Sequence, residues 1–418
     1  MLRLTHPATE PRRSREAAAQ EACSTLQNGR TDGFDEVGEV TVGVDSGVIG
    51  AAPRPAEAEG DRERIASLDG LRAFGVTIVV AYHCIGKVAA GGRLGVDVFF
   101  ALSGFLITTI VAREIVRTDG LRIVRFYWRR LLRLYPALLA TIVLTLAFFP
   151  LMTRDGGLRD WLQSAVFAGS YTMDIAIATG RMSADTALSP TWTLAMEEQF
   201  YLIWPLVLLL LLRRRVPTAV ALVATLVALG ASWASLLASP YAEFRPDLRA
   251  GALLVGCAAA LAVSMKQLPR FTANAVLWLA PPLLVGVVAA ASWTHPVVPA
   301  VATIAVSALT AAAVPSLLVS RRHPVTRMLS ARWASWLGRR SYAVYLLHLP
   351  VLQGVMGATG WGAERAAILA VPVILLIAEA SYRWVESPAL RFRDRRENTV
   401  GAPRTAPPVE HSRSVGPI

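Results

Sequence analysis

The sequence predicts an all-α polytopic membrane protein with about ten transmembrane helices around a polar cavity. Hydrophobic residues make up 54% of the 418 residues and charged residues only 17%, which is typical of a chain that lies mostly in lipid. The apolar residues are gathered in runs of about twenty, the length that a helix needs to cross a bilayer. The net charge of +12 lies in short arginine clusters at the ends of these runs. It therefore indicates membrane topology and does not indicate nucleic-acid binding.

Both ends of the chain differ in composition from the apolar part between them. Residues 1–64 contain more acidic than basic residues, show no sustained apolar periodicity and lack the basic-then-apolar pattern of a signal peptide. We predict that they form a disordered cytoplasmic tail. The Arg-, Pro- and Ser-rich residues 392–418 predict a second disordered cytoplasmic tail. The membrane domain is then expected to cover residues 65–391.

Ten apolar spans are predicted within this domain. In chain order they cover residues 68–88, 94–112, 135–152, 191–212, 217–238, 248–265, 273–293, 297–319, 335–357 and 364–385. A further candidate at 161–178 is interrupted by polar side chains, and we interpret it as an external interfacial or re-entrant segment. Without it, the arginine clusters fall on one side of the membrane. This predicts a multi-pass protein of the inner (cytoplasmic) membrane with both termini in the cytoplasm.

The first two spans carry ionisable residues inside or beside apolar sequence: Arg72, His83 and Asp97. Such a group at the bilayer centre costs roughly 2.5–3.5 kcal/mol on insertion scales, so these residues are functional candidates. Arg72 and His83 are eleven residues apart, about three helical turns and about 16 Å of rise. Their side chains are therefore expected to share one face, which we predict lines the polar cavity.

In the ten-span topology, two glutamates come to a depth similar to that of His83 and Asp97. They are Glu197 and Glu198, in the outer half of the fourth span. A histidine beside a carboxylate in a dry site is the pattern of a general base held in one tautomer. The alternative is a structural ion pair or a buried polar network between helices.

The segment 121–136 interleaves basic and apolar residues at helical spacing and includes Arg129, Arg130 and Arg133. One interpretation is an amphipathic helix on the inner leaflet, where arginines meet anionic lipid. The functional interpretation is a phosphate clamp, because the arginine fork pairs with two phosphate oxygens at once. A phosphorylated donor that arrives from the cytoplasm would need such a clamp at the inner mouth of the cavity.

His348 lies in the middle of the ninth span, one turn after Tyr345 on roughly the same face. This spacing favours an intramembrane hydrogen-bond anchor over a second catalytic histidine, and both residues are candidates for a supporting role. The three cysteines have no paired spacing, so the sequence predicts neither a disulfide framework nor a metal site.

Six stretches of the sequence resemble signatures of the integral-membrane acyltransferase-3 family, in the family's order. They are IASLDGLRAFGVTIVVAYH, GVDVFFALSGFLI, RRLLRLYP, WTLAMEEQFYLIWP, SYAVYLLHLP and the closing Y-x-W-V-E-S-P from Tyr382 to Pro388. Each apolar motif alone is weakly specific, whereas six in register are strongly specific. The resemblance covers about residues 65–392.

The resemblance implies about ten helices and the transfer of an acyl group, often acetyl from acetyl-CoA, to a hydroxyl of a sugar, glycan, lipid or metabolite. It implies that His83 is the catalytic residue and Arg72 its motif partner. It further implies that the acyl-CoA donor is handled by Arg129, Arg130 and Arg133, and that the site is supported by Glu197 and Glu198.

The expected chemistry is general-base catalysis by His83 on the acceptor hydroxyl, with Glu197 or, as second choice, Asp97 orienting the ring. The sequence leaves open whether the acyl group passes through an acyl-histidine or moves directly. Many polysaccharide-modifying members carry an extracytoplasmic hydrolase-like domain after the helices. Only a short tail follows here, so we expect the single-domain form.

The competing function is a transporter or exporter of a small polar or anionic substrate, because buried charges also line substrate pathways. The sequence shows no clear inverted repeat and no paired Gly- or Pro-broken helices, which are typical of such carriers.

Overall fold

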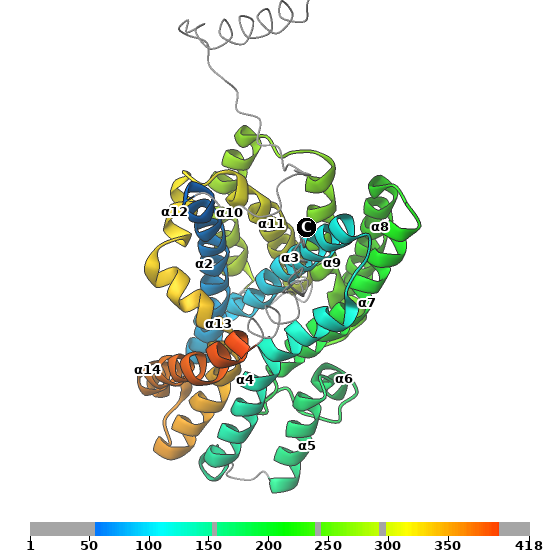
Figure 1. The fold of residues 1–418 in the computed structure, drawn as a ribbon. Helices are drawn as coiled ribbons and strands as arrows, with labels where there is room; N and C mark the ends of the chain where they lie inside the picture. The colour runs from blue at the N-terminus through cyan, green and yellow to red at the C-terminus, as the bar shows by residue number, and fades with distance from the viewer. Residues whose placement is uncertain (1–54, 153–156, 239–243, 292–297, 393–418) are drawn as a thin grey trace, which may run out of the picture. The chain divides into compact units, whose positions relative to one another are not determined.

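A computed structural model describes residues 55–152, 157–238, 244–291 and 298–392 of the chain (Figure 1). Every regular element within these ranges is helical, which confirms the predicted all-α class. The predicted N-terminal tail differs over its last ten residues, because the first described helix begins at Pro55 and not near residue 68. The other tail residues, 1–54 and 393–418, lie outside the described residues.

Fifteen elements follow one another along the described chain. They are α2 (Pro55–Ile85), η1 (Gly86–Leu94), α3 (Gly95–Thr118), α4 (Ile123–Met152), α5 (Leu158–Gly169), α6 (Met173–Ala178), α7 (Thr191–Arg213), α8 (Thr218–Ala238), α9 (Pro246–Met265), α10 (Arg270–Ala290), α11 (Val298–Val319), α12 (Pro324–Leu329), α13 (Arg332–Thr359), α14 (Ala363–Ser381) and η2 (Tyr382–Glu386).

Eight stretches of the described helices are long and apolar enough to cross a membrane. They begin with Ala66–Ile85 and Ala89–Thr118, and they continue through α4, α7, α8, α9, α10 and α11. These eight overlap the first eight predicted spans, although the third runs over Ile123–Ala147 instead of the predicted 135–152. The last two predicted spans correspond to α13 and α14, which are long enough but more polar. Tyrosine, histidine, glutamine and glycine lower the mean hydropathy of α13, and α14 contains Glu364, Arg365 and Glu379. The count of ten therefore stays a prediction.

Two predicted segments look different in the structure. The basic segment 121–136 and the span 135–152 are one continuous helix, α4, so the arginines sit on the first turns of a membrane helix. The ambiguous segment 161–178 is broken into α5 and α6, which have 12 and 6 residues. Tyr171, between them, has a φ of 55°, a left-handed conformation that ends the first helix. Neither helix is long enough to cross a bilayer.

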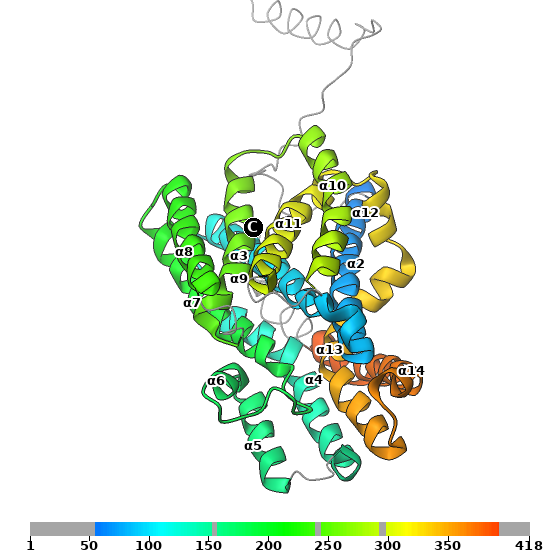
Figure 2. The same cartoon turned by 180° about the vertical axis from the view of Figure 1, so that it is seen from behind.

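Among the described helices that could cross a membrane, α3 is the most buried. Helix α2 packs on α13 and α3, and α3 packs on α9, α7 and α11. In both views of the fold α4, α5 and α6 lie away from α10, α11 and α12 (Figures 1 and 2). One apolar core joins α2, α3 and α13, and it includes Val76 of α2, Phe100 of α3 and Leu346 of α13.

A glycine brings α13 against α2. A Cβ atom at Gly338 would lie 1.8 Å from the carbonyl oxygen of Asp69, so only glycine allows this backbone contact. Ten residues later on α13 the ring of His348 meets that of His83, fourteen residues after Asp69 on α2. Contacts that advance together along both chains mean that the two helices run in the same direction. Spans one and nine of the predicted topology have this relation.

Candidate active site

The structure brings His83, near the end of α2, against His348 in the middle of α13. Their ring centroids are 4.7 Å apart, and the rings are inclined at 62°, edge to face. His83 is partly exposed, whereas His348 is only 1% exposed. Two histidines that are 265 positions apart in the sequence therefore form one pair.

The hydrogen bonds of these rings fix their tautomers. The Nδ1 atom of His83 lies 3.0 Å from the carbonyl oxygen of Val79, and Nδ1 of His348 bonds the carbonyl of Tyr345. Because a carbonyl oxygen can only accept, each Nδ1 carries the proton and donates it. Each Nε2 therefore has a free lone pair. The Nε2 atom of His348 is buried and has no hydrogen-bond partner in the described part of the chain.

The predicted carboxylates lie elsewhere. Asp97, in the first turn of α3, is fully buried and forms an ion pair with Arg249 of α9 at 3.0 Å. Glu197, on α7, accepts a hydrogen bond of 2.9 Å from the hydroxyl of Ser103. The ring nitrogen of His83 that was expected to bond a carboxylate bonds the backbone of Val79 instead. The expected histidine–carboxylate pair is thus corrected to a histidine–carbonyl pair.

Glu198 lies in the arginine-rich part of the site. Arg130 of α4 donates to it through Nη2 at 2.8 Å and through Nε at 3.2 Å. The guanidinium of Arg130 also stacks on the ring of Tyr201, 3.4 Å from its centroid. A two-point bond plus an aromatic face is a fixed geometry for an arginine. This arrangement holds α4 against α7.

The other arginines of the predicted clamp differ in what they contact. Arg72 of α2 donates to Asp69 at 3.0 Å, and Arg129 is half-buried beside Arg130 on α4. Arg133 is exposed and lies within electrostatic range of Arg72 and Arg130. In the described residues, no carboxylate lies within ion-pair distance of Arg133. Its fork is therefore available to a ligand, whereas those of Arg72 and Arg130 already hold carboxylates.

Tyr345 fixes the α13 side of the histidine pair. Its hydroxyl donates to the carbonyl of Pro190 and accepts from the hydroxyl of Thr193, each at 3.0 Å. Thr193 lies in the first turn of α7, and Pro190 immediately precedes that helix. These bonds and the bond from His348 to the Tyr345 carbonyl attach one turn of α13 firmly to its surroundings.

Sequence reasoning missed several partners of the site residues. Arg249 lies inside a predicted span, so the argument that identified Arg72 as a buried charge applies to it equally. Its Nη1 atom donates to Thr303 of α11 at 2.9 Å, a second bond beside the one to Asp97. By contrast, no sequence signal identifies the carbonyl of Val79 as the partner of His83, because every helical residue has a carbonyl.

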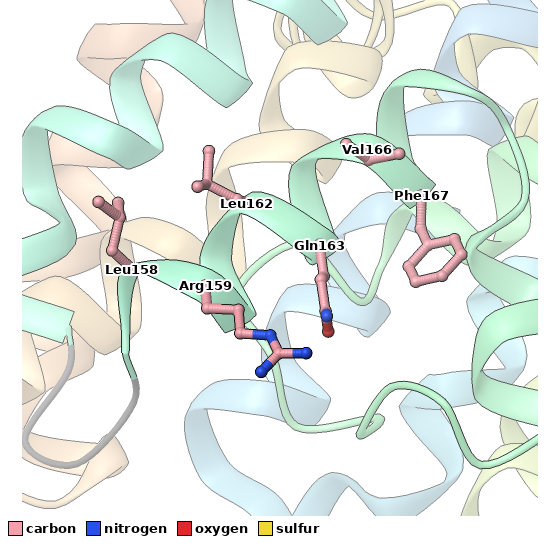
Figure 3. A pocket seen from close by; sticks show the side chains of 6 residues that line it. All are labelled: Leu158, Arg159, Leu162, Gln163, Val166 and Phe167. Carbon is pink, nitrogen blue, oxygen red and sulfur yellow. The ribbon is translucent and has the colours of Figure 1, made fainter.

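The short helix α6 docks on α7 beside this region. The side-chain amide of Gln199 donates to the carbonyl of Tyr171 and to Asp174, each at 3.0 Å. Burial raises the pKa of the Asp174 carboxyl above its ordinary value of 3.8. A separate shallow pocket on α5 is lined by Leu158, Arg159, Leu162, Gln163, Val166 and Phe167 (Figure 3). It contains none of the predicted site residues.

Comparison with known proteins gives a family match over most of the chain. Residues 65–378 match the family described as an acyltransferase domain. The peptidoglycan O-acetyltransferase OatA of Listeria monocytogenes is 31% identical over 354 residues, which cover 78% of this chain and 56% of that protein. No solved structure matches the chain.

Two further relatives show the same coverage. The putative peptidoglycan O-acetyltransferase YrhL of Bacillus subtilis is 33% identical over 351 residues, 78% of this chain and 54% of that protein. The O-acetyltransferase OatA of Staphylococcus aureus is 30% identical over 348 residues, 77% of this chain and 56% of that protein. The chain spans about half the length of the curated relatives that it matches.

Proposed function

The chain belongs to the acyltransferase family whose domain it matches, and from this premise we propose that it transfers an acetyl group from acetyl-CoA to a hydroxyl of a glycan. The relatives are named as O-acetyltransferases, two of them acting on peptidoglycan, which supports a cell-envelope glycan as the acceptor. We place the protein in the inner membrane with both termini in the cytoplasm, so that the donor enters from the cytoplasmic side.

The observation that carries this proposal is the free lone pair on Nε2 of His83. Acyl transfer to a hydroxyl needs a base at the acceptor oxygen, because alcohols are hardly ionised at neutral pH. A neutral imidazole with Nδ1–H bonded to a carbonyl presents Nε2 as that base. The partial exposure of His83 leaves the ring accessible to an acceptor.

In the proposed reaction, His83 takes up one proton from the acceptor and later gives one proton to the leaving thiolate. Nε2 of His83 takes the hydroxyl proton while the acceptor oxygen forms a bond to the thioester carbonyl carbon. The C–S bond then breaks, and the imidazolium returns its proton to the thiolate of CoA. The products are the O-acetyl ester and CoA–SH, and the histidine returns to its starting tautomer.

The charged residues of α2 and α4 support a donor site close to Arg72. Arg72 precedes His83 by about 16 Å along the helix, and Arg133 of α4 lies in its electrostatic range. Arg133 would bind the phosphates of the donor directly, with Arg72, Arg129 and Arg130 adding positive charge. Glu198 would keep Arg130 in place, and Glu197 would balance the charge of this cluster.

The test is acetyl transfer by the purified protein in proteoliposomes, with acetyl-CoA as donor and peptidoglycan fragments as acceptors. His83→Ala should lower kcat by roughly 10²–10⁴-fold, the usual contribution of a general base. Cys84→Ala is the matched control, because Cys84 is the next residue of α2 and its side chain is buried in the apolar core. Near-normal transfer by His83→Ala protein would refute the proposal.

A further inference from the structure

The geometry points to a role for the second histidine. We infer that His348 is a positioning residue whose Nε2 lone pair shares the proton that His83 takes from the acceptor hydroxyl. This inference rests on the proposed function, since it concerns the same base.

The first reason is that both rings are locked in the same tautomer. Each Nδ1–H is bonded to a carbonyl of its own helix, so neither ring can turn its N–H toward the other without losing that bond. With His83 neutral, the Nε2 atom of each ring in the pair carries a lone pair and neither carries a proton. A buried nitrogen without a partner is destabilising and needs an explanation, which a transient N–H donor would provide.

The second reason is that, among the described residues, no carboxylate bonds or contacts the ring of His83 on which the cation forms. Asp97 is paired with Arg249, and Glu197 accepts a hydrogen bond from Ser103. An imidazolium in a site of low dielectric needs a hydrogen-bond acceptor for each N–H. The carbonyl of Val79 serves Nδ1. The rings of Tyr82 and His348 both contact His83, at 4.8 and 4.7 Å. Of these two, His348 has the buried lone pair without a partner among the described residues, and it could serve Nε2.

The proton balance is simple. The proton leaves the acceptor hydroxyl for Nε2 of His83, and the new N–H is then shared with the lone pair of His348. It returns through Nε2 of His83 to the thiolate when the C–S bond breaks. His348 gains and loses no net proton, and it touches neither substrate. Its ring stays in place because Tyr345, whose carbonyl it bonds, is itself held by Thr193 and Pro190.

A pair of amide variants separates this role from simple packing. His348→Asn keeps a side-chain N–H for the carbonyl of Tyr345 but has no acceptor near the position of Nε2. His348→Gln is one methylene longer and can place its amide oxygen near that position, as an acceptor that does not titrate. Both variants carry an uncharged amide side chain, so they differ mainly in where this acceptor lies.

We expect His348→Asn to lower kcat by roughly 10–100-fold, with the KM values for acetyl-CoA and for the acceptor unchanged, because a hydrogen bond to a charged group is lost. His348→Gln should recover most of the lost kcat. Equal kcat values in both variants and in the wild type would overturn the inference, and so would equal losses in both. If His83→Ala protein kept its activity, the proposed function would fail as well.

A second measurement reads the tautomers in the wild-type protein, and variants serve only to assign its signals. Nitrogen NMR of the wild-type protein labelled with ¹⁵N-histidine reports the tautomer of each ring directly. We expect both His83 and His348 to be protonated at Nδ1 alone, with assignments from single His→Gln variants of the other histidines. A His348 signal for protonated Nε2 would overturn the inference, because that nitrogen would then have no lone pair to share.

Discussion

At the scale of single residues, the described structure sorts the buried charges by partner. Asp97 and Arg249 neutralise each other inside the bundle, and Arg130 and Glu198 do so at a half-buried position. Buried ions are tolerated only when they are paired and hydrogen-bonded. The pairs therefore explain why charges occur in these apolar runs without every one of them taking part in chemistry.

Asp97 is expected to act on stability more than on catalysis. Asp97→Ala should destabilise the protein by about 3–5 kcal/mol, because the guanidinium of Arg249 is left buried without its partner. The double variant Asp97→Ala/Arg249→Met should recover much of this loss, since no charge then remains. Thermal unfolding in detergent would measure both effects. A stable Asp97→Ala protein with a much lower kcat would instead give Asp97 a catalytic role.

Arg133 is expected to be the arginine on which donor binding depends most. Replacing Arg133 by Ala should weaken acetyl-CoA binding by roughly 10–100-fold, because a charge-assisted bond to phosphate is lost. The remaining affinity should depend less on salt. Calorimetry at two ionic strengths would measure this.

Arg322→Ala is the matched control, an exposed arginine after α11 on the predicted cytoplasmic side. Unchanged donor affinity in Arg133→Ala protein would show that this part of α4 only meets the lipid surface.

At the scale of elements, the site depends on how closely α2 and α13 approach. The contact between Gly338 and the backbone of Asp69 sets their separation, and the histidine pair lies further along the same interface. Helices in lipid gain little from burying apolar surface against each other, so close packing at small residues holds them together. A change at Gly338 is therefore expected to reach His83 through the helix.

Gly338→Val should separate the two helices and lower both stability and kcat. Overpacking of this kind costs typically about 1–3 kcal/mol, and the histidine pair should lose its contact as well. Gly230→Ala on α8 is the control, because an added Cβ there meets no atom within 4 Å. We would measure thermal unfolding and acetyl transfer for both variants. Wild-type activity in Gly338→Val protein would mean that this contact does not position the site.

At the scale of the whole membrane domain, the predicted topology would place the proposed donor and acceptor on opposite sides. The parallel course of α2 and α13 agrees with their places as the first and ninth predicted spans, because spans an even number of crossings apart run in the same direction. Eight stretches of the described helices meet the length and hydropathy expected of spans. In the predicted topology, the arginines that follow α7 and α11 lie in the cytoplasm. A donor from the cytoplasm and a glycan outside could reach the same histidine from the two ends of the bundle.

Cysteine labelling would test this topology. On a cysteine-free background, Arg181→Cys in the loop before α7 should react with a membrane-impermeant maleimide in intact cells. Arg214→Cys should react only after permeabilisation, because the arginines after α7 are predicted to lie inside. Both positions are exposed. Labelling of Arg214→Cys in intact cells would overturn the ten-span topology.

The sequence by itself determined the class of protein, the first eight spans and the residues that carry charge in lipid. These follow from apolar run length and from the energy of burying ions, which are properties of single segments. Only the tertiary structure decided the partners. Which carboxylate pairs with Arg249, and which ring meets His83, depends on how α2, α3, α9 and α13 pack. Packing brings together residues that are far apart in the sequence, and their spacing along the chain does not show which of them will meet.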